Sequence, residues 1–288
     1  MNDELRWHLL KKKQTEELIV HAFGRLRENG IEPILIKGWA AGRNYPADKP
    51  RFSIDVDLVV SSADFDDAEK ALAGINGVDL HRELRDRDTV DWQHLCSRSE
   101  LVELDGEHIR LLSAEDHLRV ICVHWLLSGA TDRERLWDVF YAVQNRPANF
   151  SWPLCLDIVS ETRRDWVVLT IGLTHKYLGL DISELPFRDR AVELPPWLTK
   201  FLEKEWLDES GLWPLEATLK DRRTFLHQLR KRLPPNPVQA TVNCEGSFDA
   251  YSRVPYQMRD IFQRVRPSIH RIVSTLKHIA RARTKESK

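Results

Sequence analysis

The sequence predicts an α+β protein, in which a small mixed β-sheet flanked by helices is followed by a helical part. Up to about residue 112, short apolar or alternating runs of strand length are separated by helical repeats and glycine-containing turns. From Ser113 onward, apolar residues recur at helical spacing instead. Seven of the ten tryptophans lie between residues 125 and 213, which indicates a bulky helical core in that part.

The first predicted elements are a helix and a buried strand. Apolar residues at helical spacing from Leu18 to Leu26 predict the helix, and Asn29-Gly30 ends it. The continuous apolar run at 33–36 predicts a strand that is buried on both faces. This strand ends in Lys37-Gly38, and a short helix or turn follows at 39–41.

The next elements complete the predicted sheet. Apolar and acidic residues alternate over 53–60, which predicts a strand with one acidic face. A helix is expected over 62–75 and a strand over 78–81. Residues 102–111 predict a hairpin, because Asp105-Gly106 suits a tight turn of the primed type.

The second part of the chain is predicted to be helical. Ser113-x-x-Asp116 is a capping box that opens a helix, and further helices are expected around 136–143 and 154–178. The proline-rich segment 233–237 predicts a stiff linker or loop.

Three regions follow from this order of elements. An α/β domain is expected over 1–112 and a helical bundle domain over 113–180. Residues 181–288 are expected to form a helical C-terminal region of unknown role.

The composition indicates a folded, soluble protein. The 288 residues are 42% apolar and 30% charged, and 43 basic against 44 acidic side chains leave a formal charge of −1. This balance excludes a disordered chain and a uniformly basic nucleic-acid coat. No run reaches the ~18 apolar residues of a membrane helix, and the acidic start lacks the apolar stretch of a signal peptide. Four irregularly spaced cysteines without a C-x-x-C pair favour reduced thiols. We therefore expect a cytoplasmic protein with no membrane partner.

The motif Asp55-x-Asp57 is the strongest indication of chemistry. Side chains two apart on a strand point the same way, so both carboxylates can bind one hard cation or bridge two metal ions. The alternative is an edge strand whose outward face is acidic, because D-x-D is common.

The surroundings of this motif favour the metal site. Upstream, Lys37-Gly38 is a turn where a bare backbone N–H and an ammonium can approach a phosphate. Downstream, Asp79 on a separate strand could supply a third carboxylate, with Glu103 as a substitute. A glycine turn, an acidic pair and a third acid are what two-metal nucleotidyl transfer requires.

The stretch GIEPILIKGWAAGRNYPADKPRFSIDVDLVV resembles the signature of uncharacterised nucleotidyltransferases of the DNA-polymerase-β-like superfamily. VDLHREL and LLSAEDHLRVICVHWL are similar to the third strand and the first bundle helix of that family. The resemblance covers about residues 15–145 and implies a palm-like nucleotidyltransferase domain followed by a helical domain.

The resemblance also implies a site. Asp55 and Asp57 would be the metal-binding pair, and Asp79 the third metal ligand and hydroxyl-activating base. Lys37 and Gly38 would contact phosphate. Two further residues match the family pattern: Arg51 as an accessory positive charge, and Asp138 as an acid with no assigned role.

The expected activity is transfer of a nucleoside monophosphate from an NTP, with Mg²⁺ or Mn²⁺ as cofactor, to a protein, small molecule or RNA acceptor. The superfamily glycine is usually followed by serine, whereas this chain has Trp39. An inactive nucleotide-binding or regulatory protein on the same fold is therefore an alternative.

The other alternative is a nucleic-acid-binding protein. Residues 253–288 carry ten basic and two acidic side chains, and a basic helix is predicted at the C-terminus. Residues 264–288 could bind RNA, DNA or an acidic partner, or they could be a packed helix with a solvated basic flank.

Overall fold

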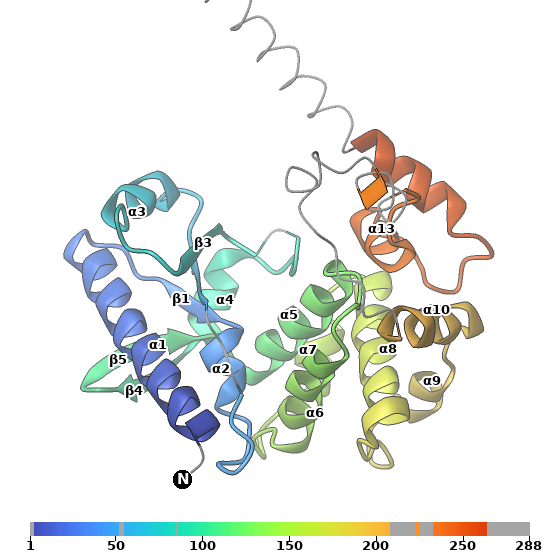
Figure 1. The fold of residues 1–288 in the computed structure, drawn as a ribbon, viewed down its shortest axis with the longest axis horizontal. Coiled ribbons are helices and arrows are strands. Elements are labelled where there is room, and N and C mark those ends of the chain that lie inside the picture. The colour runs from blue at the N-terminus through green and yellow to red at the C-terminus, as the bar shows by residue number, and fades with distance from the viewer. Residues whose placement is uncertain (1–2, 52–54, 85, 208–222, 225–232, 264–288) are drawn as a thin grey trace, which may run out of the picture. The chain divides into compact units, whose positions relative to one another are not determined.

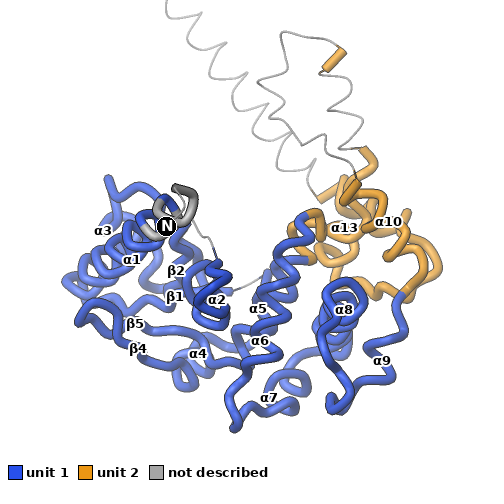
Figure 2. Tube along the Cα trace, turned by 60° about the horizontal axis from the view of Figure 1, so that its bottom comes forward, with its two compact units in different colours: residues 1–125, 132–194 blue, residues 126–131, 195–288 orange. Residues whose placement is uncertain are grey.

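The computed structural model describes residues 3–51, 55–84, 86–207, 223–224 and 233–263. The chain divides into two compact units, 1–125 with 132–194 and 126–131 with 195–288, which Figure 2 colours blue and orange. The predicted basic helix at the C-terminus lies outside the described residues. Among the described helices, none is both long enough and apolar enough to cross a membrane.

The first unit contains a five-stranded mixed sheet of order β3-β2-β1-β5-β4, which confirms the predicted α+β class. The middle pair, β1 (Ile34–Ile36) and β2 (Val56–Val60), is antiparallel. Parallel neighbours flank this pair, with β3 (Val78–Arg82) beside β2 and β5 (Glu107–Leu111) beside β1. β4 (Glu100–Leu104) forms the other edge.

The predicted hairpin joins β4 to β5. Asp105 has φ of 48° and Gly106 has φ of 84°. Positive φ at both central residues is the type I′ geometry, which matches the twist of the strands. The turn predicted from the Asp-Gly pair is therefore confirmed.

Helices cover both faces of the sheet (Figure 1). α1 (Asp3–Glu28) and α3 (Phe65–Ala71) pack on the face formed by residues such as Leu35, Val56 and Leu58. α4 (Trp92–Arg98) and α5 (Ala114–Leu127) pack on the opposite face, against Ile34, Ile36 and Val59. Alternation along β2 therefore directs Asp57, like Val59, to the face that α4 and α5 cover.

The predicted capping box begins α5. The Ser113 hydroxyl accepts a hydrogen bond from the Asp116 backbone N–H at 3.2 Å and donates to the Asp116 carboxylate at 3.0 Å. The helix then carries apolar residues into two cores, because Val120 packs under the sheet while Leu118 and Cys122 pack among the later helices.

Most of the remaining helices of the first unit form a second core. The helices in this core are α6 (Leu136–Gln144), α7 (Trp152–Leu156), α8 (Glu161–Leu178) and α9 (Arg188–Val192). Two short helices lie outside it: η1 (Arg133–Arg135) precedes α6, and α2 (Gly38–Gly42) follows β1. The helix expected around 154–178 is divided in the structure, since α7 ends at Leu156 and α8 begins at Glu161. The second unit contains α10 (Pro196–Trp206) and α13 (Pro237–Asn243).

Candidate metal and phosphate site

The parallel pairing of β2 and β3 brings two predicted acids together. In the register of the two strands, Asp57 lies opposite Asp79. Directly opposed residues of neighbouring strands point to the same face, so their carboxylates converge although 22 residues separate them in sequence.

A histidine completes this group. His81 Nε2 lies 3.1 Å from Asp57 Oδ1 and 3.1 Å from Asp79 Oδ2. Within the described part of the chain, these three residues are the set whose ligand atoms lie within 4.8 Å of one another. We call Asp57, Asp79 and His81 the acidic group. Asp57 is buried, His81 is half-buried and Asp79 is exposed, so the group opens to solvent on the Asp79 side.

His81 was not among the predicted site residues, although the sequence contains a signal for it. Asp79 and His81 are two apart on one strand, which puts both side chains on the same face. The spacing that singled out Asp55-x-Asp57 thus applies equally to Asp79-x-His81.

Lys37 lies against the acidic group. Its Nζ is 2.7 Å from Asp57 Oδ1, and both side chains are nearly buried. Burial lowers the pKa of Lys37, and the charge of Asp57 and the hydrogen bond to it partly oppose that shift. The same contacts act on the acid in the opposite direction. Burial raises the pKa of Asp57, but the hydrogen bond from His81 and the Lys37 charge outweigh it and hold the pKa at about 2. Asp57 is therefore ionised at neutral pH.

The backbone at Lys37 is unusual. Its φ of 56° and ψ of −151° lie close to a region that is essentially restricted to glycine, and Gly38 follows with φ of 40°. This turn at the end of β1 brings the ammonium to β2, and Ile36 of β1 is the register partner of Asp57.

Asp55 is not a member of the acidic group. It is exposed and lies just before the first residue of β2, Val56. Because Asp55 is outside the strand, the alternation of side chains along β2 does not align it with Asp57. Glu103, the predicted substitute for Asp79, lies on β4 at the opposite edge of the sheet from β3.

Arg51 makes its closest ion pair with Asp138 of α6. Arg51 Nε lies 2.6 Å from Asp138 Oδ1, and Arg51 Nη2 lies 2.9 Å from Oδ2, so the pair is bidentate. The Tyr45 hydroxyl donates to the same carboxylate at 2.6 Å. Burial lowers the pKa of Arg51, but the Asp138 contacts more than compensate and raise it. The acid without an assigned role thus joins the loop after α2 to the helical part of the first unit.

Trp39 packs against the core on the α1 face of the sheet, and its indole Nε1 donates to Glu16 at 3.0 Å. The acidic group lies on the opposite face. The bulky residue that stands in the usual place of serine therefore has a structural partner of its own on α1.

Comparisons with known proteins are sparse. No family model matches the sequence, and no curated protein matches it. A solved structure of an antigenic nucleotidyltransferase-like protein from Paracoccidioides brasiliensis aligns with a TM-score of 0.43 at 13% identity, covering 64% of this chain and 94% of that chain. A likeness this distant says nothing about function, which has to be inferred from the residues of this chain.

Proposed function

We propose that this protein is a metal-dependent nucleotidyltransferase, which transfers a nucleoside monophosphate from an NTP to an acceptor and releases pyrophosphate. The convergence of Asp57, Asp79 and His81 beside the Lys37 ammonium is the observation that carries this proposal. The sequence resemblance over residues 15–145 supports it independently, since it includes both strands that form the acidic group.

The acidic group fits a divalent cation. Carboxylate oxygens are the ligands that Mg²⁺ and Mn²⁺ prefer, and an imidazole nitrogen is a common ligand of transition metals. The low pKa of Asp57 keeps that ligand charged at neutral pH. Asp79 is exposed, so the open side of the group is available to substrate oxygens. A bound Mg²⁺ or Mn²⁺ would neutralise phosphate charge and favour deprotonation of an attacking hydroxyl.

The residues of the chain divide the remaining work. The acceptor hydroxyl oxygen forms a bond to the α-phosphorus, the bond from that phosphorus to the β-phosphate oxygen breaks, and pyrophosphate leaves. Asp79, on the solvent side, takes the hydroxyl proton. The Lys37 ammonium neutralises charge that develops on the phosphates, and Gly38 leaves the backbone beside it free of a side chain. Asp55 and Arg51 remain predicted contributors to metal and phosphate binding.

The test combines metal binding with label transfer. The wild-type protein and the Asp57→Asn/Asp79→Asn variant are titrated with Mn²⁺. Both are then incubated with each α-labelled NTP, Mg²⁺ or Mn²⁺ and a cell extract. Asp67→Asn is the matched control, because Asp67 is an exposed acid on α3 that pairs with Lys70 at the surface. We expect the wild type and the control to bind Mn²⁺ and to label an acceptor, and the double variant to do neither.

Two outcomes would contradict the proposal. If the double variant binds Mn²⁺ as tightly as the wild type, the acidic group is not the metal site. If the wild type binds Mn²⁺ and nucleotide but labels nothing, the inactive nucleotide-binding alternative holds instead. Asp55→Asn, tested in the same way, decides whether that residue contributes a ligand.

A further inference from the structure

The helical part of the first unit contains a pocket of about 490 Å³. It is lined by the beginning of α8 and by residues of the segment 183–190, which leads from the loop after α8 into α9. Three of the lining residues are arginines: Arg164 of α8, and Arg188 and Arg190 of α9. Among the described residues that line the pocket, Asp189 is the one acid, so the lining has a formal charge of +2. Sites for small molecules have volumes of ~300–1,000 Å³, so this pocket is large enough for a small anionic ligand.

The ion pairs of two of these arginines lie at the surface. Arg164 Nη1 lies 3.3 Å from Asp157 Oδ1, and about half of each side chain is exposed. Arg190 Nη2 lies 3.6 Å from Asp165 Oδ2, and its Nη1 lies 3.9 Å from Glu193 Oε2; both distances are longer than a hydrogen bond. Exposed pairs of this kind contribute little to stability, so an anion that enters the pocket can replace the acids at small cost.

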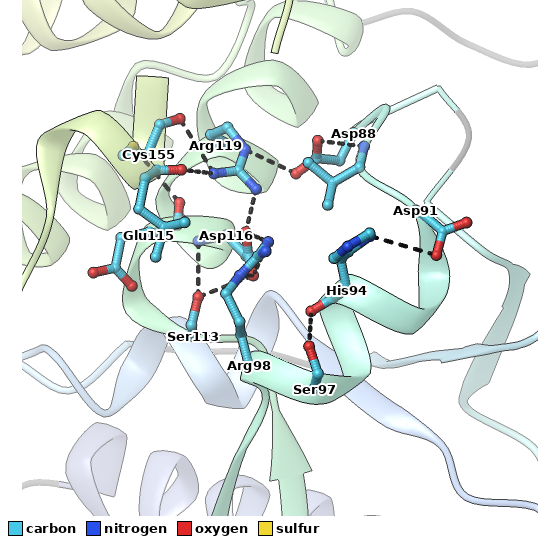
Figure 3. A network of polar contacts seen from close by, with 12 residues as sticks. Asp88, Asp91, His94, Ser97, Arg98, Ser113, Glu115, Asp116, Arg119 and Cys155 are labelled. Atoms are coloured by element: carbon cyan, nitrogen blue, oxygen red, sulfur yellow. Dashed lines mark hydrogen bonds and ion pairs between the residues drawn. The ribbon is translucent and has the colours of Figure 1, made fainter. Parts of the chain in front are cut away.

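The third arginine, Arg188, is exposed at the start of α9. In the part of the chain that the structure describes, no carboxylate pairs with its guanidinium. An arginine that stabilises the fold has different surroundings: Arg119 is buried, and it donates to Asp88 and Asp116 (Figure 3). The donors of Arg188 therefore remain accessible to a ligand, whereas those of Arg119 are used within the fold.

The two sides of the pocket are held together by close packing. α8 and α9 approach each other at Gly172, where a Cβ would collide with the carbonyl oxygen of Ala191. Phe187, which lines the pocket, is buried and packs edge-on against Trp152 of α7, with 4.8 Å between the ring centroids. The arginines of α8 and α9 are thus carried by elements that cannot move apart easily.

The polar network in Figure 3 holds α7 in turn. Arg119 Nη1 donates to the carbonyl oxygens of Leu154 and Cys155 at 3.1 and 3.2 Å. The Glu115 carboxylate accepts from the backbone N–H of Ser151 at 2.9 Å. The wall of the pocket is therefore fixed before a ligand binds, which lowers the entropic cost of binding.

The number of arginines favours a phosphate group over a carboxylate as the ligand. In this protein a single guanidinium satisfies a carboxylate with two hydrogen bonds, as Arg51 does with Asp138. A phosphate group attached to an organic molecule carries a charge of about −1.5 to −2 at pH 7 and offers three acceptor oxygens. It can therefore bind more than one guanidinium, and its charge matches that of the lining.

We infer that this pocket, which we call the arginine pocket, binds the phosphate group of a small molecule through Arg164, Arg188 and Arg190. Leu185 and Phe187 add apolar residues to the lining, which favours a phosphate ester with an apolar part over the free phosphate ion. All the described lining residues lie beyond position 160, so the arginine pocket is separate from the acidic group on β2 and β3. The inference does not depend on the proposed function.

The experiment measures the binding of phenyl phosphate and of inorganic phosphate by calorimetry, with a chelator present so that no metal ion takes part. The wild type is compared with Arg188→Gln, Arg188→Lys and Arg164→Gln/Arg188→Gln. The matched control is Arg135→Gln, because Arg135 forms an exposed pair with Asp132 at 3.3 Å, as Arg164 does with its own acid, and does not line the pocket. We expect Arg188→Gln to weaken phenyl phosphate binding at least about tenfold, since charge-assisted hydrogen bonds are lost. The double variant should weaken it further, and Arg188→Lys should keep part of the affinity.

Two further measurements separate binding from folding and from the acidic group. The substituted arginines lie at the surface, so the melting temperatures of the variants without ligand should stay close to that of the wild type. The Asp57→Asn/Asp79→Asn variant should bind phenyl phosphate like the wild type, because its arginine pocket is intact. Tighter binding of phenyl phosphate than of inorganic phosphate would support an ester as the ligand, and equal binding would support the phosphate ion in the same pocket.

Three outcomes would overturn the inference. The first is a wild-type protein that binds neither anion at millimolar concentration. The second is an equal loss of affinity in Arg135→Gln and Arg188→Gln, which would show that only the general surface charge matters. The third is normal binding in Arg188→Gln together with a loss in Asp57→Asn/Asp79→Asn, which would place the anion at the acidic group.

Discussion

His117 of α5 is buried, and its Nε2 has no hydrogen-bond partner among the described residues. Burial lowers its pKa to about 4; the negative charge of Asp138 opposes the shift, and Arg51 and Arg43 add to it. The folded protein therefore holds a neutral imidazole at pH values where the unfolded chain takes up a proton.

The first prediction concerns acid stability. Above pH ~6.5 the imidazole is neutral in both states and contributes nothing. As the pH falls from there towards 4, the unfolded state gains a proton that the folded state excludes, so the free energy of unfolding falls, by about 2 kcal/mol at pH 5. The variant His117→Gln should lose this part of the pH dependence, as measured by urea unfolding at pH 7 and pH 5.

The exposed residue His94 provides the control for this measurement. His94→Gln should keep the wild-type slope between the two pH values. Equal slopes in His117→Gln and the wild type would show that another group causes the acid sensitivity.

Individual site residues were predictable where spacing on a single strand or a motif singled them out. Asp57, Asp79 and Lys37 were named on those grounds, and the strand register brings them together. His81 was not named, because only the pairing of β3 with β2 shows that its imidazole meets Asp57. Contacts between segments that are distant in sequence leave no local sequence pattern, unlike the periodicity of a strand, so residues brought to the site in this way cannot be predicted from the sequence.

At the scale of elements, α8 and α9 approach each other closely at Gly172. A Cβ built on Gly172 would lie 1.9 Å from the carbonyl oxygen of Ala191, which is backbone and cannot move aside independently. Gly24 of α1 is the opposite case, because a Cβ there would meet nothing within 4 Å. Close packing of two helices therefore requires glycine at position 172, whereas no steric contact requires it at position 24.

The second prediction compares these positions. Gly172→Ala should destabilise the protein by about 2 kcal/mol or more, since overpacking forces the helices apart. Gly24→Ala should stabilise it by about 0.5–1 kcal/mol, since alanine favours the helix and the site has room. Denaturant unfolding of both variants checks the signs, and a destabilised Gly24→Ala together with a neutral Gly172→Ala would contradict the geometry.

Most elements of the first unit were predictable from periodicity and turn residues, as the hairpin at Asp105-Gly106 and the capping box at Ser113 illustrate. The strand expected over 53–60 begins at Val56 in the structure, because strand ends depend on pairing with a neighbour rather than on alternation. α4 was not predicted. Its Leu95 is buried under the sheet, but seven residues are too few to show a clear helical repeat.

At the scale of the whole molecule, residues 126–131 belong to the second unit although their sequence neighbours belong to the first. Two side chains hold this segment within the second unit. Trp206 Nε1 donates to the Ala130 carbonyl oxygen at 2.9 Å, and Asn236 Nδ2 donates to that of Gly129 at 3.0 Å. Asn236 also caps α13, since its Oδ1 accepts from the backbone N–H groups of Val238 and Gln239. A domain boundary of this kind, formed by contacts between distant segments, has no signature in composition.

The third prediction is that the two units unfold separately. Asn236→Ala removes the cap and the contact to Gly129, so it should destabilise the second unit by about 1–2 kcal/mol. In scanning calorimetry it should lower one transition and leave the other in place, whereas Gly172→Ala should lower the other. A single transition that both variants shift equally would show that the chain unfolds as one cooperative unit.

The backbone at Lys37 has one more consequence. A glycine at this position would relieve a conformational cost on the order of 1–3 kcal/mol, and it would also delete the ammonium beside Asp57. An engineer who selected variants for heat resistance alone would be led to this replacement. The resulting variant would be more stable but would lack the ammonium beside Asp57. Substitutions that raise the thermal stability of this chain should therefore be made at other positions.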